Sequence, residues 1–332
     1  MRVQRIQGRL GLMGGLSLAL VLIWSGMVSA QTFSSGSTGA DGAFAPTANT
    51  ILTLPPNGVF NYATVDVPAG VTVTFQRNAA NTPVTILATG NVTIAGTINV
   101  NGTKGTDGAT SGPSFNLGAL GGPGGFTGGQ GGSRDGLLLP SAGQGPGGGP
   151  PQGGPSFANG NYGAPTSFVS LLPLFGGSGG GGGTRVSSFS GTSGAGGGGA
   201  LVIASSTQIA VTGFVRANGG DAGLIAGSIT QGTGSGGAIR LVAPQINGTG
   251  TLEAKGGSGA VTGGSGRVRL EAFTLGFTGT SNPAASLSTA PGPVTAASTP
   301  ALVNLPTLTI ASVGCVAAPT TPGGTYTTAD VA

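Results

Sequence analysis

Residues 196–220 read GGGGALVIASSTQIAVTGFVRANGG, and they join a run of glycines directly to strand-like sequence. The part after the glycines recurs twice, as VTILATGNVTIAGTINVNG (84–102) and, with one residue deleted, as IRLVAPQINGTGTLEAKGG (239–257). A fourth, incomplete copy begins at VRL (268–270). Apolar residues occupy equivalent positions, so that Val84 aligns with Leu201, Ile86 with Ile203, Val92 with Ile209, Ile94 with Val211 and Ile98 with Val215.

Each copy contains three short runs in which β-branched residues alternate with small or polar ones, separated by bends rich in Gly, Asn and Pro. This pattern predicts strands, and one such unit is too small to bury its apolar face alone. Stacked copies bury it, so the sequence predicts an all-β parallel β-helix, or solenoid, over residues 51–280. An antiparallel β-sandwich is the alternative. The same bend residues recur at equivalent positions of the copies. This recurrence favours the solenoid, because stacked rungs place equivalent bends on one another, whereas the turns of hairpins need not resemble each other.

Two glycine-rich insertions, at about residues 118–165 and 176–199, interrupt the strands. The chain has 71 glycines and 22 prolines among 332 residues, a share that without a period would indicate low-complexity sequence. One interpretation is that these insertions are loose loops. The other is that they form extended polyglycine helices with three residues per turn, which pack closely because glycine has no side chain. The abrupt joins between glycine runs and strands favour the ordered form.

The ends of the chain differ from its middle. Residues 1–30 combine basic residues, an apolar run and the small residues Val28-Ser29-Ala30, which predicts a signal peptide cleaved after Ala30 and a secreted or cell-surface protein. The alternative is an uncleaved membrane anchor, which the shortness of the apolar run disfavours. Residues 31–50 form a small, polar lead-in, and residues 281–332 a Pro/Ala/Thr-rich tail with one or two strands. The single cysteine, Cys315, excludes an intrachain disulfide; we interpret it as a small apolar residue rather than an intermolecular link.

The charges exclude several functions. Three of the twelve basic residues lie in the signal peptide, which leaves nine against eight acidic residues, so we expect no nucleic-acid partner and membrane contact only before cleavage. The chain has no histidine, the usual general base and the commonest metal ligand. We therefore predict no catalytic residue and no cofactor.

Two aspartates are the candidates for chemistry that remain. Asp107 and Asp221 follow equivalent turns, and stacking would bring them together. Such a pair could act as acid and base in a polysaccharide lyase or hydrolase, or could bind Ca²⁺. The interpretation that we favour is two solvated turn residues, because aspartate is common in turns. Calcium is disfavoured because the tandem Gly-Asp repeats of calcium-binding β-rolls are missing.

Three arginines alternate with apolar residues on the last predicted strands. Arg240, Arg267 and Arg269 are expected to form an outward-facing basic column, which Glu253 and Glu271 would neutralise in part. Such a column could bind an acidic surface glycan. Edge protection and solubility are the alternative role, and the one that we favour.

The succession GGGGALVIA…VTGFVRANGGDAG, GSGGAIRLVA…GTGTLEAKGG and GGSGRVRLEA resembles an uncharacterised group of exported bacterial glycine-rich proteins over residues 84–275. It is similar, more loosely, to the glycine-rich extracellular domain of anaplastic lymphoma kinase. The resemblance implies a structural or surface protein, and it carries over no catalytic residue. We therefore expect a structural or adhesive surface or matrix protein, with surface glycans or further copies of the chain as its partners. The alternatives are a carbohydrate-active β-helix enzyme and a glycan-binding adhesin.

Overall fold

The computed structural model separates the chain into two units, residues 1–294 and residues 295–332. In the second unit, β21 (Ser312–Val313) pairs antiparallel with β22 (Val316–Ala317). The predicted signal peptide and Cys315 lie outside the described residues. No helix occurs in the described part of the chain, and therefore none that could cross a membrane. Besides these two strands, the structure describes residues 32–151, 159–162, 170–230 and 232–294.

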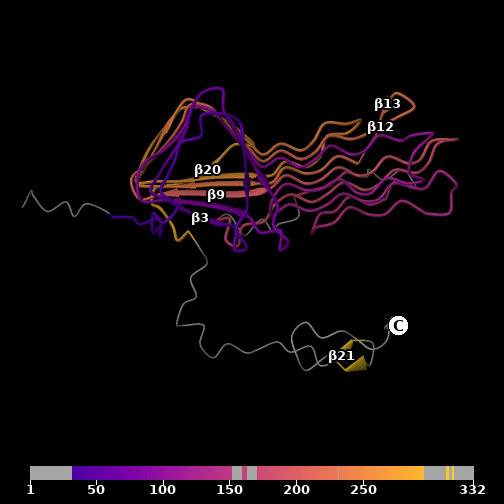
Figure 1. Cartoon of the computed structure of the whole chain (residues 1–332), viewed down its shortest axis with the longest axis horizontal. Coiled ribbons are helices and arrows are strands. Elements are labelled where there is room, and N and C mark those ends of the chain that lie inside the picture. Colours follow the sequence, from indigo (N-terminus) through magenta and orange to yellow (C-terminus); the bar gives the residue numbers. More distant parts are fainter. Residues whose placement is uncertain are drawn as a thin grey trace, which may run out of the picture. The chain divides into compact units, whose positions relative to one another are not determined.

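The first unit contains a solenoid of three parallel sheets with six strands each (Figure 1). The chain visits the sheets in the order A, B, C and then begins the next rung. Sheet A contains β1 (Ala43–Phe44), β4 (Thr64–Val67), β7 (Val92–Ile94), β10 (Gln208–Val211), β15 (Gln245–Gly248) and β18 (Thr274–Phe277). Sheet B contains β2 (Thr50–Thr53), β5 (Thr72–Gln76), β8 (Thr97–Asn99), β11 (Phe214–Arg216), β16 (Thr251–Glu253) and β19 (Thr280–Asn282). Sheet C contains β3 (Val59–Tyr62), β6 (Val84–Ala88), β9 (Ala200–Ser205), β14 (Ala238–Val242), β17 (Arg267–Glu271) and β20 (Ser286–Ser288).

The register of the strands matches the alignment of the repeats residue for residue. The five aligned pairs, from Val84 with Leu201 to Ile98 with Val215, are Cα partners in neighbouring parallel strands. The third copy continues the register, with Ile203 opposite Leu241. The predicted parallel β-helix is thus confirmed, and the antiparallel sandwich is wrong for this unit.

The solenoid extends beyond the predicted limits of residues 51 and 280. It begins with the two-residue strand β1, which pairs with β4, and it ends with β19 and β20, which pair with β16 and β17. These terminal strands contain few β-branched apolar residues and cover only one neighbour each. The alternating pattern that indicates the inner rungs is therefore too weak there to mark strands.

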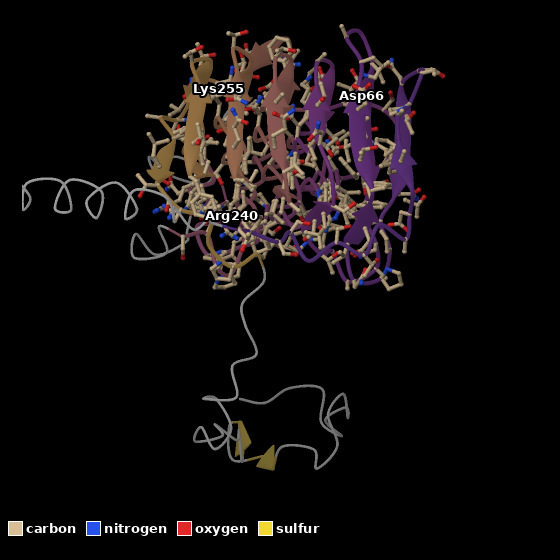
Figure 2. All side chains as sticks on the ribbon, turned by 90° about the vertical axis from the view of Figure 1, so that its left-hand side faces the viewer. Asp66, Arg240 and Lys255 are labelled. Carbon is tan, nitrogen blue, oxygen red and sulfur yellow. The ribbon has the colours of Figure 1, made fainter. Side chains whose placement is uncertain are left out.

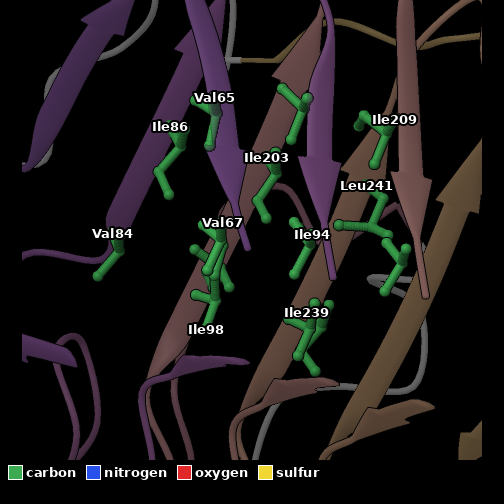
Figure 3. Close-up of a cluster of buried hydrophobic side chains, with 14 of the residues drawn as sticks. Val65, Val67, Val84, Ile86, Ile94, Ile98, Ile203, Ile209, Ile239 and Leu241 are labelled. Carbon is green, nitrogen blue, oxygen red and sulfur yellow. The ribbon is translucent and has the colours of Figure 1, made fainter. Parts of the chain in front are cut away.

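The core of the solenoid consists of the residues that alternate inward along each strand. Ile94 from sheet A and Ile203 and Leu241 from sheet C are fully buried and point into the interior of the solenoid (Figure 3). Burial of a side chain of this size contributes about 1.5–3 kcal/mol. Aromatic rings fill the first two rungs, where Phe60 lies 5.6 Å from Tyr62 and 6.1 Å from Phe75 between ring centroids.

A bundle of extended glycine-rich segments lies beside the solenoid (Figure 1). In three successive rungs the chain leaves the end of a sheet B strand, runs through this bundle and returns into sheet C. We call it the glycine bundle. It comprises the described parts of residues 100–199, 217–237 and 254–266, and it includes the antiparallel hairpin of β12 (Leu224–Ile225) and β13 (Ser228–Ile229).

The backbone of the glycine bundle repeats every three residues. Along residues 193–199, one N–H in each triplet donates to the segment 100–106, the next donates to 126–129 and the third donates to 232–235, with N···O distances of 2.7–3.1 Å. A helix with three residues per turn points successive N–H groups in three directions, as this segment does. The described parts of the glycine-rich insertions that share this pattern are therefore ordered polyglycine helices rather than loose loops.

Close packing of backbones explains why these segments need glycine. All residues from 190 to 199 are buried, and a Cβ added at Gly194 would overlap the carbonyl oxygen of Gly180. At Gly197 the same added atom would overlap the carbonyl oxygen of Gly177. The segments pair by backbone hydrogen bonds and leave almost no room for side chains. The bundle also begins earlier than predicted, directly after β8, because Gly102, Gly105 and Gly108 recur at the three-residue spacing.

Candidate functional site

The predicted basic column is not a single exposed feature. Arg240 points out of sheet C as expected, but its side chain is only 1% exposed, so it neither faces a ligand nor serves solubility, the role that we favoured. It lies among packed side chains, well apart from Asp66 and Lys255 (Figure 2). The segment 292–294 covers it: Nη2 donates to the carbonyl of Pro293 at 2.8 Å and Nη1 to that of Val294 at 3.3 Å.

Glu271 is the centre of the charge cluster beneath this segment. Its carboxylate accepts two hydrogen bonds from Arg240, each of 2.9 Å, one of 2.6 Å from Nε of Arg269, and one of 2.7 Å from the backbone N–H of Gly292. Burial acts to raise the pKa of Glu271, but the bonds from the two arginines outweigh it and hold the pKa below its ordinary value. The arginines and Glu271 thus anchor residues 292–294, and we call this cluster the Glu271 clamp.

Apolar contacts complete the cover over the outer face of sheet C. Leu87, Val202 and Val242 form a second buried cluster there, against which Phe33, Leu174 and Val294 pack. Three distant parts of the chain therefore meet on this face. Arg240 is buried beneath this cover, and Arg269 is bonded to Glu271 and only 16% exposed. Both arginines therefore stabilise the fold and are not available to a glycan.

Arg267 differs from the other two arginines. It lines a cavity of about 440 Å³ at the junction of sheet C and the glycine bundle, and its guanidinium carbon lies 5.6 Å from the centre of the Tyr162 ring. Its backbone N–H donates to the carbonyl of Gly237, but among the described residues its guanidinium group has neither a hydrogen bond nor an ion pair. Of the predicted column, Arg267 alone is placed where a ligand could meet it.

The two candidate aspartates lie on neighbouring segments of the glycine bundle, as stacking predicts. The backbone N–H of Gly105 donates to the carbonyl of Asp221 at 2.8 Å. However, each carboxylate binds the backbone of the next segment: Asp107 accepts from the N–H of Leu224 at 2.8 Å and Asp221 from that of Ser258 at 2.7 Å. The hydrogen bond from Leu224 is the main cause of a lowered pKa for Asp107. No cluster of three or more acidic, Cys or His residues occurs within the described ranges.

A row of polar residues stands where the bundle leaves sheet B. Oδ1 of Asn101 accepts from the N–H of Asn218 at 2.7 Å, and Oδ1 of Asn218 accepts from that of Lys255 at 2.9 Å. Glu253 bonds Nε of Arg216 at 2.9 Å and Nζ of Lys255 at 2.7 Å. These bonds hold the roots of three segments in register. The aligned turns Asn101-Gly102, Asn218-Gly219 and Lys255-Gly256 were the signal that could have revealed this row.

A loop of the bundle presents apolar side chains to solvent. Leu137 and Leu139 are 82% and 80% exposed, and Leu138 between them is 44% exposed. The loop is nevertheless fixed by hydrogen bonds within it. The backbone N–H of Ser133 donates to the carbonyl of Leu138, and the N–H of Leu138 donates back to the hydroxyl oxygen of Ser133. The carboxylate of Asp135 accepts from the N–H of Leu137 at 2.9 Å. These leucines lie outside the strand repeats, between two glycine runs, and no pattern in the sequence marks them as exposed.

Comparison with known protein families, with curated proteins and with solved structures gave no match to this chain.

Proposed function

We propose that this chain is an exported, non-enzymatic structural protein of a cell surface or extracellular matrix, in which the solenoid holds a rigid glycine bundle and its loops. The buried segment 190–199 carries the proposal. Its backbone is hydrogen-bonded on three sides, and this arrangement resists salt and does not depend on disulfides. A protein outside the cell benefits from both properties.

The placement of the carboxylates supports a scaffold over a carbohydrate-active enzyme. A glycoside hydrolase needs two carboxyl groups that face a sugar. Asp107 and Asp221 instead each accept a backbone hydrogen bond from an adjacent segment, which is what a structural residue does. The resemblance to exported glycine-rich proteins and the predicted signal peptide support the same proposal.

The test combines location with activity. The full chain, expressed in a bacterium with a matched export pathway, is expected outside the cytoplasm with Gln31 as its first residue, measured by N-terminal sequencing. The purified protein is expected to release no reducing ends from a panel of acidic and neutral polysaccharides. Retention in the cytoplasm contradicts the export. If the protein cleaves one of these polysaccharides, and an Asp107→Asn or Asp221→Asn variant abolishes the cleavage, the chain is an enzyme instead.

A further inference from the structure

The cavity beside Arg267 combines features that the scaffold role does not require. Its lining includes Tyr162 and Asn161 from the glycine bundle, Arg267 and Val268 from β17, and Ser286 from β20. A volume of about 440 Å³ falls in the range typical of small-ligand sites, about 300–1,000 Å³. The lining contains one cation and no carboxylate among the described residues, so the cavity favours an anionic ligand.

Arg267 is exceptional among the cations in the described ranges. Every other arginine and lysine there donates at least one hydrogen bond to a carboxylate or a carbonyl. Arg216, for example, also packs over an aromatic ring, that of Phe214, but its charge is paired with Glu253. Arg267 has the aromatic contact without the carboxylate. Its five N–H donors are therefore available to an incoming acid group, which a guanidinium binds in a bidentate manner.

Tyr162 is fixed in a form suited to a sugar ring. Its hydroxyl donates to the carbonyl of Phe175 at 3.1 Å, and burial raises its pKa to about 12, against the opposing effect of Arg267. The phenol is therefore neutral at ordinary pH. Aromatic rings bind the apolar face of a ligand, and the side chains of Asn161 and Ser265 offer polar partners beside it.

We infer that this cavity binds an acidic sugar, with Arg267 on the carboxylate of a hexuronate and Tyr162 against its ring. A hexuronate matches the single cation, the aromatic face and the polar lining together, whereas a peptide carboxylate would use only the arginine. The inference goes beyond the scaffold role and does not depend on it, because a scaffold without this site remains a scaffold.

Isothermal titration of the full exported chain with trigalacturonate tests the site, with the fully methyl-esterified trisaccharide as the matched neutral ligand. We expect binding of the acid and at least about tenfold weaker binding of the ester, because charge-assisted hydrogen bonds are lost. Galacturonate monomer and polygalacturonate titrated in parallel distinguish a free sugar acid from a polymer as the source.

Two variants and one control assign the binding to the cavity. Arg267→Gln and Asn161→Asp, each checked for folding by circular dichroism, are expected to weaken binding about tenfold or more, the second by placing a negative charge in the lining. Arg185→Gln is the control, because Arg185 is an exposed arginine that bonds only the carbonyl of Ser187.

Four results would overturn the inference. These are undetectable binding of the acid, equal binding of acid and ester, an Arg185→Gln variant as weak as Arg267→Gln, and unchanged binding in the folded cavity variants. Tighter binding of a peptide with a free terminal carboxylate than of trigalacturonate would also overturn it, in favour of a protein partner.

Discussion

The solenoid and the glycine bundle alternate along the same chain but are held together by different forces. In the solenoid, side chains such as Ile203 and Leu241 fill the interior, and backbone hydrogen bonds join the rungs. In the bundle, the segment 190–199 is equally buried, but it is surrounded mainly by other backbones. One region buries apolar surface, and the other buries paired N–H and C=O groups.

This difference makes the bundle dependent on the solenoid. Glycine loses more conformational entropy on folding than any other residue, and each hydrogen bond repays only about 0.5–1.5 kcal/mol net. The segments begin and end at strands such as β8 and β9, so the rungs fix both ends of each excursion in register. Because the rungs already fix the ends of each glycine segment, the segment loses less conformational entropy when it becomes ordered.

The largest effect is expected from a side chain placed inside the bundle. Gly197→Val puts a branched side chain where a single Cβ would already overlap the carbonyl oxygen of Gly177. Since the neighbour is backbone and cannot rotate away, we expect a loss of more than about 4 kcal/mol in the free energy of unfolding, measured by chemical denaturation.

Gly132→Ala is the matched control in the same bundle. The nearest atoms to an added Cβ there are the backbone N of Arg185 and Cδ of Pro140, both at 3.4 Å, which is an ordinary contact. Alanine also restricts the unfolded chain, so stability should be unchanged or rise by up to about 1 kcal/mol. Equal destabilisation by both variants would mean that packing is not what selects glycine.

In the solenoid, we expect the largest loss of stability from substitutions that leave a cavity, not from those that add atoms. Ile203 is fully buried between Ile86 and Leu241 of the neighbouring rungs. We expect Ile203→Ala to cost about 2–5 kcal/mol and Ile203→Val about 1 kcal/mol, measured in the same denaturation experiment. A loss for Ile203→Val as large as that for Gly197→Val would contradict the contrast between the two regions.

The sequence predicts the solenoid so well because inward positions repeat at a fixed spacing. Ile86, Ile203 and Leu241 can be aligned by eye, and the structure places them on one another. The order of the glycine bundle is harder to predict, since each segment is ordered only by neighbours far away in the chain. Gly194, for example, bonds Gly129, and no local pattern links those two positions.

The candidate site was predicted only in part, for a related reason. Arg240 and Arg267 look alike in the sequence, since both alternate with apolar residues on strands of one sheet. Segments far away in the chain determine the surroundings of each side chain: residues 292–294 cover Arg240, and Tyr162 packs beside Arg267. Alternation tells which side of the sheet an arginine faces, but not what lies over it.

The smallest effect is expected at the Glu271 clamp, which titrates, whereas the buried segment 190–199 contains no ionisable group. The folded-state pKa of Glu271 lies below its ordinary value of 4.5, so its contribution to stability is complete above that pH and is lost as the pH falls through the folded-state value. The groups facing it are Arg240, Arg269 and the N–H of Gly292. When residues 292–294 are released, the guanidinium of Arg240 becomes hydrated. Protonation of Glu271 is therefore expected to open this segment locally rather than to unfold the whole unit.

Hydrogen exchange of the full chain at pH 5 and pH 3, corrected for intrinsic rates, separates the two regions. We expect the amide of Gly292, which donates to Glu271, to lose protection at pH 3 while those of 190–199 keep theirs. Glu271→Gln should open the segment already at pH 5. Glu253→Gln, which removes a carboxylate at the root of the bundle, should leave it closed, because Glu253 bonds Arg216, Asn218 and Lys255 and none of the clamp residues. If residues 190–199 opened together with 292–294, acid would be acting on the whole unit and the two regions would not be separable.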